Sequence, residues 1–364
     1  MELSLKTSTL QELMAKAVKG ASNNKLIPLT SLICIKLEKG TLTLITTDAT
    51  NYLYAKAEKI AGDDFYAVVE IDTLSKLIAR LTCEDTKLIL KDSSLEIVGN
   101  GTYNIEIPVD EEGNAIKYPD PLSSINLKKV KKQEIHLSTI NTILDTLKPA
   151  LATTLETPCY TGYYSGDRVV ATDTFKIASM AVQLFEEPVL ISPEMMNLLS
   201  VMTQENIEVQ IKDDVLVFNS KDISIYGNTL EGIDEFQIDA ISSVVDSEFN
   251  STCTVDKAVL LQILDRLSLF VGAYDKNAIE LVFTKKGLQI SSKASTGVEI
   301  IKYIDSENFS DFSCDINIVM LTTQIKANAD DVITIHYGGD TPALKMTDGN
   351  VTHLIAFLES EDTE

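Results

Sequence analysis

The chain has 364 residues, with 31 Lys and Arg against 54 Asp and Glu, and its net charge is -23. A single core rarely serves that length, because domains usually hold about 100–200 residues, so we expect two or three domains. The acidic balance and the presence of only three arginines argue against a protein that reads a base sequence, because such proteins are usually basic where they contact DNA and often use arginine to recognise guanine.

No part of the sequence approaches the run of about 20 apolar residues that spans a bilayer. The first six residues lack a basic region followed by an apolar one, so we expect no signal peptide. The five cysteines are scattered and have no C-x-x-C spacing, which is typical of a reducing compartment and not of a disulfide framework or a zinc site. The sequence therefore predicts a cytoplasmic protein that does not associate with membranes.

In chain order, the same pattern of an amphipathic helix, a strand, a turn with glycine and another strand occurs three times. The predicted helices are 8–18, 137–144 and 255–264, and the strand pairs that follow are 33–44, 160–171 and 279–290. The turn glycines Gly40, Gly166 and Gly287 are 126 and 121 residues apart, about a third of the chain. A period this long indicates repetition of whole domains, since solenoid repeats are about 20–50 residues long.

Each third has a second half with the same order of elements. Short strands at 69–72, 191–194 and 315–318 lead into helices, and alternating strands at 87–90, 207–211 and 332–335 follow. The sequence thus predicts an α+β protein of three similar domains, 1–122, 128–245 and 246–364, each an internal duplication of a strand–helix–strands unit. The predicted linkers are 116–127 and 242–250.

Three segments carry a resemblance to a known family. Residues 170–178, V-A-T-D-T-F-K-I-A, are similar to a V-A-T-D-G-H-R-L-A segment; residues 25–29, K-L-I-P-L, are similar to T-L-P-I-L; and residues 353–358 stand where that family has Y-V-V-M-P-M. With the threefold repeat, these segments make the whole chain resemble the bacterial DNA polymerase III beta subunit, the sliding clamp. The resemblance implies the DNA-clamp fold, with two chains closing head to tail into a ring.

Several positions depart from the family pattern. The family's Gly-His-Arg is Thr174-Phe175-Lys176 here, its Met-Pro-Met is Ala356-Phe357-Leu358, and an arginine before the first sheet aligns with Asn24. The family's F-P-D/E-Y-like segment, which closes its second domain, is replaced here by residues 232–236, G-I-D-E-F. The chain is therefore identified as a divergent member, with altered partner preference as one expected consequence.

The resemblance implies a processivity factor that encircles duplex DNA without reading its sequence. The scarce positive charge is then expected on the helices that face the DNA, where contacts to phosphates alone would permit sliding. For each basic residue the alternative is an ordinary solvated helix face. The candidates are Lys16, Lys19, Lys25, Lys76, Arg80, Lys148, Lys257, Arg266 and Lys326.

The family also binds short partner peptides in an apolar cleft between its second and third domains. Carried over by alignment, the cleft residues are Tyr160, Thr172, Thr174, Phe175, Lys176 and Ile177 from the second domain, and Ile318, Ala343, Leu354, Ala356, Phe357 and Leu358 from the third. For Ile177 and Leu354 a place in the core is an equal alternative. The subunit interface is expected at Tyr103 and Ile105 on one side and Leu269 and Phe270 on the other, where the last two could equally be core.

Catalysis has no support in the sequence, which lacks a phosphate-binding G-x-x-x-x-G-K-[ST] loop, H-E-x-x-H and G-x-S-x-G. His136, His336 and His353 lack the spacing of metal ligands and are expected on sheet surfaces. Asp173 is expected to organise a turn through bonds to the backbone, with a metal-binding carboxylate as the alternative. The sequence thus predicts a non-catalytic accessory subunit of the polymerase III holoenzyme that needs no cofactor.

The partners that the resemblance implies are a second copy of the chain, double-stranded DNA, an ATP-driven clamp loader and the replicative polymerase alpha subunit. Repair polymerases, mismatch-repair proteins and ligase are further candidate ligands of the cleft. A different class of function stays open: a clamp-like interaction module that recruits or sequesters clamp-binding partners without encircling DNA.

Overall fold

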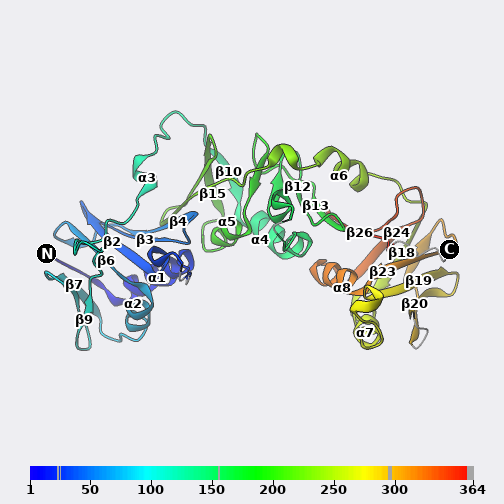
Figure 1. Ribbon diagram of the computed structural model, residues 1–364, viewed down its shortest axis with the longest axis horizontal. Helices are drawn as coiled ribbons and strands as arrows, with labels where there is room; N and C mark the ends of the chain where they lie inside the picture. The colour runs from blue at the N-terminus through cyan, green and yellow to red at the C-terminus, as the bar shows by residue number, and fades with distance from the viewer. Residues whose placement is uncertain (23, 25, 155, 294–296, 359–364) are drawn as a thin grey trace. The chain divides into compact units, whose positions relative to one another are not determined.

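The computed structural model describes residues 1–22, 24, 26–154, 156–293 and 297–358 (Figure 1). Across these residues, no helix is both long and apolar enough to cross a membrane. The chain divides into two compact units, Met1–Ile140 with Glu194–Thr229 and Asn141–Pro193 with Leu230–Glu364. The predicted middle domain, 128–245, therefore contributes to both units, and the three domain ranges stay a prediction.

The first unit contains a five-stranded and an eight-stranded antiparallel sheet. The order of the smaller sheet is β5 (Ala61–Gly62), β1 (Glu2–Lys6), β7 (Asp85–Leu90), β8 (Ser94–Val98) and β9 (Thr102–Glu106). The order of the larger sheet is β10 (Gln133–His136), β15 (Asn206–Lys212), β16 (Val215–Asn219), β17 (Ile223–Asn228), β4 (Asn51–Ala57), β3 (Thr41–Thr47), β2 (Leu32–Glu38) and β6 (Phe65–Glu70).

Two helices pack side by side in this unit, α1 (Thr7–Ala17) and α2 (Ile71–Ile78). In α1 the buried residues Leu10, Leu13, Met14 and Ala17 recur with helical spacing, so one stripe of the helix faces the sheets. The amide of Thr73 donates to the side chain of Glu70, which caps the start of α2. A short 3₁₀ helix, η1 (Val18–Gly20), follows α1, and another, η2 (Pro28–Ser31), precedes β2.

The second unit contains a nine-stranded and a four-stranded antiparallel sheet. The order of the larger sheet is β14 (Val189–Ile191), β11 (Tyr163–Ser165), β12 (Val169–Thr172), β13 (Lys176–Met180), β26 (Val351–Ala356), β25 (Ala343–Asp348), β24 (Val332–Tyr337), β18 (Ser251–Asp256) and β22 (Asp305–Glu307). The order of the smaller sheet is β21 (Val298–Ile301), β20 (Gly287–Ser292), β19 (Ala278–Thr284) and β23 (Phe312–Asn317).

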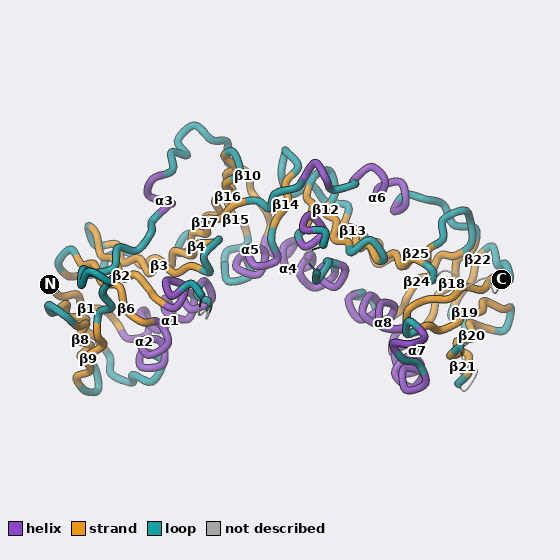
Figure 2. The backbone as a smooth tube through the Cα atoms, in the orientation of Figure 1, coloured by secondary structure: helices purple, strands orange, loops and turns teal. Residues whose placement is uncertain are grey.

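In the second unit α7 (Lys257–Leu267) and α8 (Ile318–Ala327) pack side by side (Figure 2). Leu264 of α7 and Ile325 of α8 are buried in one core with strand residues of both sheets. Phe283 and Tyr337 stack there with ring centroids 3.9 Å apart. The remaining short helices of this unit are η3 (Lys148–Ala150), η4 (Pro158–Thr161), η5 (Ile233–Glu235), α6 (Ile238–Val245), η6 (Ser268–Phe270) and η7 (Ala273–Asp275).

All six predicted helices are present and in the predicted order, with α4 (Leu137–Thr146) and α5 (Pro193–Leu199) completing the set. The predicted linkers are more ordered than expected. The first contains a one-turn helix, α3 (Pro121–Ser124), and Tyr118 ties it to the sheet by donating its hydroxyl to the carbonyl of Leu32. The second predicted linker, 242–250, begins inside α6. Ile241 and Val245 are buried on one face of this helix, and the two serines between them made the segment look polar in the sequence.

Two strand pairings join successive thirds of the chain into continuous sheets. In the first unit β4 pairs with β17, with Tyr52 opposite Tyr226. In the second unit β13 pairs with β26, with Ile177 opposite Leu354. The pairings are equivalent by the internal repeat, and each satisfies a strand edge that would otherwise be open.

Candidate functional site

One hydrogen-bonded turn links β12 to β13 in the middle of the resemblance. The hydroxyl of Thr172 donates to the carbonyl of Lys176 at 2.8 Å and accepts from the amide of Thr174 at 3.0 Å. One carboxylate oxygen of Asp173 accepts from the amides of Phe175 and Lys176 at 3.0 and 2.9 Å. The prediction that Asp173 organises this turn is confirmed.

The same turn links β3 to β4 in the first unit, with Thr47 and Asp48 in the equivalent places. The hydroxyl of Thr47 donates to the carbonyl of Asn51 and accepts from the amide of Ala49, and Asp48 accepts from the amides of Thr50 and Asn51. The third residue of each turn has a positive φ, 92° for Ala49 and 78° for Thr174. The repeat therefore extends to individual side-chain bonds.

A small apolar pocket of about 200 Å³ lies beside the second of these turns. Four predicted cleft residues line it, Tyr160, Thr172, Thr174 and Ile177. Ala343 and Leu354 belong to the same apolar cluster and lie behind it. Pockets that enclose a whole small ligand are usually about 300–1,000 Å³, so this one is suited to a single anchor side chain of a longer ligand.

The wall opposite the turn comes from α6, through Ala240, Ile241 and Val244. These three residues were not predicted. The four-residue spacing of Ile241 and Val245 indicates a helix, whereas the polar residues between and after them indicate a linker. Behind the pocket Phe236 stacks on Tyr164 with centroids 5.0 Å apart and meets Tyr160 edge to face at 5.1 Å.

Three predicted cleft residues lie in the turn or are bonded to it. Phe175 stands at the tip of the turn with 61 % of its surface exposed. Lys176 donates to the second carboxylate oxygen of Asp173 at 2.7 Å, and only 11 % of its side chain is exposed. The amide of Ala356 donates to the carbonyl of Phe175 at 2.8 Å, which fixes the end of β26 against the turn.

Three other predicted cleft residues are placed elsewhere in the second unit. Ile318, at the start of α8, is only 1 % exposed and belongs to the core between the helices and the sheets. Phe357 packs against that same core, with its ring 5.8 Å from the ring of Phe312. The amide of Leu358 donates to the carbonyl of Asp315. Alignment alone could not separate these residues from the pocket, because side chains near the end of a strand can face either core.

The basic residues expected on α1 and α2 differ in their partners. Lys16 is ion-paired with Asp222, and Lys76 with Asp72 four residues earlier on the same helix. Lys19 and Arg80 are exposed and make no ion pair within the described part of the chain. Lys25 lies outside the described residues.

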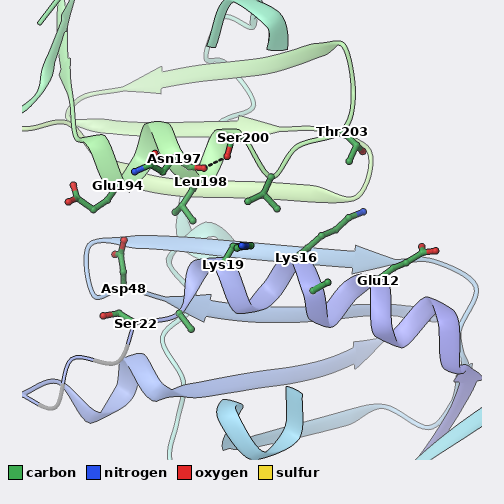
Figure 3. Close-up of a pocket in the computed structure, with 13 residues that line it drawn as sticks. Glu12, Lys16, Lys19, Ser22, Asp48, Glu194, Asn197, Leu198, Ser200 and Thr203 are labelled. Atoms are coloured by element: carbon green, nitrogen blue, oxygen red, sulfur yellow. Dashed lines mark hydrogen bonds between the residues drawn. The ribbon is translucent and has the colours of Figure 1, made fainter. Parts of the chain in front are cut away.

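A hollow of about 820 Å³ adjoins α1 and η1 in the first unit. Figure 3 shows Lys16 and Lys19 on one wall and Asn197, Leu198 and Ser200, at the end of α5, on the other. The carboxylates of Glu12, Asp48 and Glu194 also line this hollow, so its charge is mixed.

In the second unit the expected basic residues lie on α7, α8 and η3. Lys257 donates to the backbone carbonyl of Asn328, and Arg266 makes two hydrogen bonds to Glu299, at 2.8 and 2.6 Å. Lys326 is exposed in the last turn of α8, and Lys148 is exposed on η3.

The four residues expected at a subunit interface are exposed with one exception. Leu269 is 81 % and Phe270 48 % exposed on η6, and Tyr103 is partly exposed on β9. Ile105 is buried, because it faces the core while its neighbours Asn104 and Glu106 on the opposite face of β9 are exposed. Among the described residues β9 and β21 are each paired on one side only, so both are open sheet edges.

The described residues include no group of three or more His, Cys, Asp and Glu side chains that could hold a metal ion. Of the histidines, His353 is fully buried under α8 and not on a sheet surface, with Nδ1 2.6 Å from Oε1 of Gln324. The pocket beside the turn and the exposed cations of the helices are features that a binding function can use.

Comparison with solved structures defines the class of fold as the sliding clamp. The DNA polymerase sliding clamp of Bacillus subtilis aligns with a TM-score of 0.83 at 17% identity over 99% of both chains. The DNA polymerase III beta subunit of Thermotoga maritima aligns with a TM-score of 0.83 at 18% identity over 99% of both chains, and the subunit from Pseudomonas aeruginosa with 0.82 at 13% over 99% of this chain and 100% of that one.

No protein-family model matches the chain, and no curated protein sequence matches it. The α+β clamp fold that the resemblance predicted is confirmed over essentially the whole chain.

Proposed function

We propose that the chain is a sliding clamp, a non-catalytic ring of two copies that encircles duplex DNA and tethers a DNA polymerase to it. The observation that carries this proposal is the clamp fold. It aligns along 99% of this chain and along 99% of the solved sliding clamp of Bacillus subtilis and beta subunit of Thermotoga maritima. A fold shared from end to end, with the repeated units intact, is what a ring-forming function requires.

The distribution of charge supports DNA as the partner. Residues 7–20, 71–80, 137–150, 193–199, 257–270 and 318–327, which contain the six helices of the internal repeat, hold eight basic and five acidic residues, whereas the whole chain holds 31 and 54. These helical segments thus have a net positive charge in an acidic protein. Lys19, Arg80 and Lys326 are the strongest candidates for phosphate contacts, since they are exposed and without an ion pair among the described residues.

The exposed apolar residues support pairing of two copies. The open edge of β9, with Tyr103, and the open edge of β21, beside Leu269 and Phe270, lie in different units of one chain. Head-to-tail contact between such unlike edges generates a closed ring when the rotation closes. The pocket beside Thr172 would hold an anchor residue from a partner such as the polymerase alpha subunit, a repair polymerase, a mismatch-repair protein or ligase.

The first test is the mass in solution by light scattering across a dilution series. We expect a mass near twice the 40.0 kDa of one chain. Leu269→Lys with Phe270→Ser should give a folded monomer, because these side chains are exposed in the single chain and their loss removes apolar contact only from the dimer. A strict monomer at micromolar concentration for the unaltered chain would contradict the ring.

The second test is retention on DNA. The protein is assembled on circular duplex with a clamp loader and ATP, and the complex is filtered before and after a single cut of the DNA. We expect retention on the circle and release from the cut duplex, with retention independent of base sequence. Equal retention on both forms would refute encirclement, and loss of both would favour a module that recruits clamp-binding partners without surrounding DNA.

Charge variants identify the surface that contacts DNA. Lys19→Ala, Arg80→Ala and Lys326→Ala should each weaken association similarly on all sequences and reduce the salt slope by about 0.9 per lost phosphate contact. Lys128→Ala is the matched control, because Lys128 is exposed but lies in the loop between α3 and β10. An equal effect of the control would show that only net charge matters.

A further inference from the structure

The segment that forms the outer wall of the pocket is strongly acidic. Residues 230–250 contain six Asp and Glu and no Lys, Arg or His. Four of these carboxylates, Glu231, Asp234, Glu235 and Asp239, are exposed on η5, on α6 or on the residues that lead into them. The segment that contributes Ala240, Ile241 and Val244 to the pocket lining thus also presents this negative charge to a ligand that extends beyond the pocket. These four carboxylates are called the acidic rim.

These carboxylates are close enough to the pocket to act on its lining. Burial raises the pKa of the Cys159 thiol, and the charge of Glu235 raises it further; Cys159 precedes Tyr160, which lines the pocket. Burial also raises the pKa of Tyr164, and the charges of Asp167 and then Asp239 raise it further; Asp239 directly precedes the lining residue Ala240. A Cβ at Gly232 would lie 3.4 Å from Cβ of Cys159 and 3.7 Å from Oε2 of Glu235, so Glu235 lies near the residue before Tyr160, and Asp239 adjoins the lining residue Ala240.

The cations near the pocket are already engaged. Lys176 bonds to Asp173 at 2.7 Å. Arg168 makes two hydrogen bonds to Asp246, at 3.1 and 2.9 Å. Lys345 donates to the carbonyl of Val245 at 2.9 Å, and burial lowers the pKa of its ammonium group. Lys176 and Arg168 neutralise Asp173 and Asp246, and Lys345 bonds to a backbone carbonyl. None of these bonds neutralises the carboxylates of Glu231, Asp234, Glu235 and Asp239.

We infer that the pocket selects a peptide in which an apolar anchor residue is flanked by lysine or arginine. The inference rests on the proposed function, since it takes the pocket as the site for a partner peptide. The apolar lining and the volume of about 200 Å³ fit one anchor side chain, and the exposed Phe175 offers an adjacent apolar contact. The flanking residues then lie over the rim, where positive charge is attracted and negative charge is repelled.

The test compares three blocked peptides that share one central leucine as the apolar anchor and carry two lysines, two serines or two glutamates on each side. Binding is measured by fluorescence anisotropy at low and at high salt. An exposed pair of opposite charges contributes about a 1.4- to 5-fold change in affinity, so we expect the lysine peptide to bind at least about tenfold tighter than the glutamate peptide. The difference should shrink at high salt, because exposed charges are screened.

Charge-neutral variants show whether the rim is responsible. Glu235→Gln with Asp239→Asn removes two of the four rim charges, so it should reduce the difference between the lysine and glutamate peptides and leave the affinity of the serine peptide nearly unchanged. Asp305→Asn with Glu307→Gln removes the same charge from β22, the far edge strand of the same sheet, and should preserve the difference. Val244→Arg places a bulky charged side chain in the pocket lining and should weaken all three peptides if the anchor sits there.

Two failures can be told apart. Equal or tighter binding of the glutamate peptide at low salt would overturn the inference but leave the pocket as a peptide site. No binding of any of the three peptides, or binding that Val244→Arg does not weaken, would overturn both the inference and the proposed role of the pocket.

Discussion

Protonation of a single buried histidine should govern how the second unit responds to acid. His353 lies on β26 and is fully buried beneath α8. Because the side-chain oxygen of Gln324 can only accept, the bond to Nδ1 places the hydrogen there and leaves Nε2 unprotonated. Nε2 is buried without a hydrogen-bond partner among the described residues, so a second proton would create an unsolvated charge.

The magnitude follows from the pKa. Burial lowers the pKa of His353 to about 4, against a small opposing effect of the Asp348 carboxylate, whereas an unfolded histidine titrates near 6.5. Above pH 6.5 both states are neutral and the residue has no pH effect. As the pH falls, the unfolded chain binds the proton first, so the free energy of unfolding decreases by about 1.4 kcal/mol per pH unit and by about 3 kcal/mol in total at pH 4.

Two measurements test this account. In a proton NMR titration the imidazole resonance that is absent from His353→Leu should have its midpoint near pH 4. In urea unfolding followed by circular dichroism, His353→Leu should lose less stability than the unaltered chain between pH 6.5 and 4. Thr352→Val, a change on the same strand without a titrating group, should follow the unaltered chain. A midpoint at pH 6 or above, or parallel curves for His353→Leu, would refute the reasoning.

Two further predictions concern the backbone. Thr174→Gly should raise the free energy of unfolding by up to about 1 kcal/mol, since a β-branched residue with a φ of 78° is strained and glycine relieves about 1–2 kcal/mol of strain at a smaller entropic cost. Ala49→Gly in the equivalent turn should raise the free energy of unfolding by less. A decrease for both variants would show that these positions are not strained. Gly287→Ala should destabilise by about 1–3 kcal/mol, because its Cβ would lie 2.3 Å from the carbonyl oxygen of Ile301. Thermal unfolding measures both, with Gly272→Ala as a control in open space that should change little.

The sequence was sufficient for the order of elements and for the repeat, because both depend on local patterns. Each of the second-half helices starts at or just after the end of a short strand, as at Glu70 and Ile71, and the glycine turn at Gly287 connects two strands as predicted. The bonds of Asp173 were also predictable, since an Asx turn is made by neighbouring residues.

What could not be predicted depends on contacts between distant segments. Lys16 meets an acid 206 residues away, and nothing near it in the sequence indicates that its charge is engaged. Ile318 and Ile105 are apolar residues whose burial depends on which side of a helix or strand faces the core. The wall of the pocket formed by α6 could be found only when the helix was seen against the turn at Thr172.

The continuity of the two large sheets has a practical consequence for work with fragments of this protein. Cutting the chain between 122 and 128 would separate β4 from β17 and leave a seven-residue strand with an unpaired edge, which is a template for aggregation. Neither compact unit is a continuous stretch of chain, so no single cut releases one of them whole. Site-directed variants of the full chain are therefore the sound way to dissect it, and an insoluble fragment would say nothing about the stability of the intact protein.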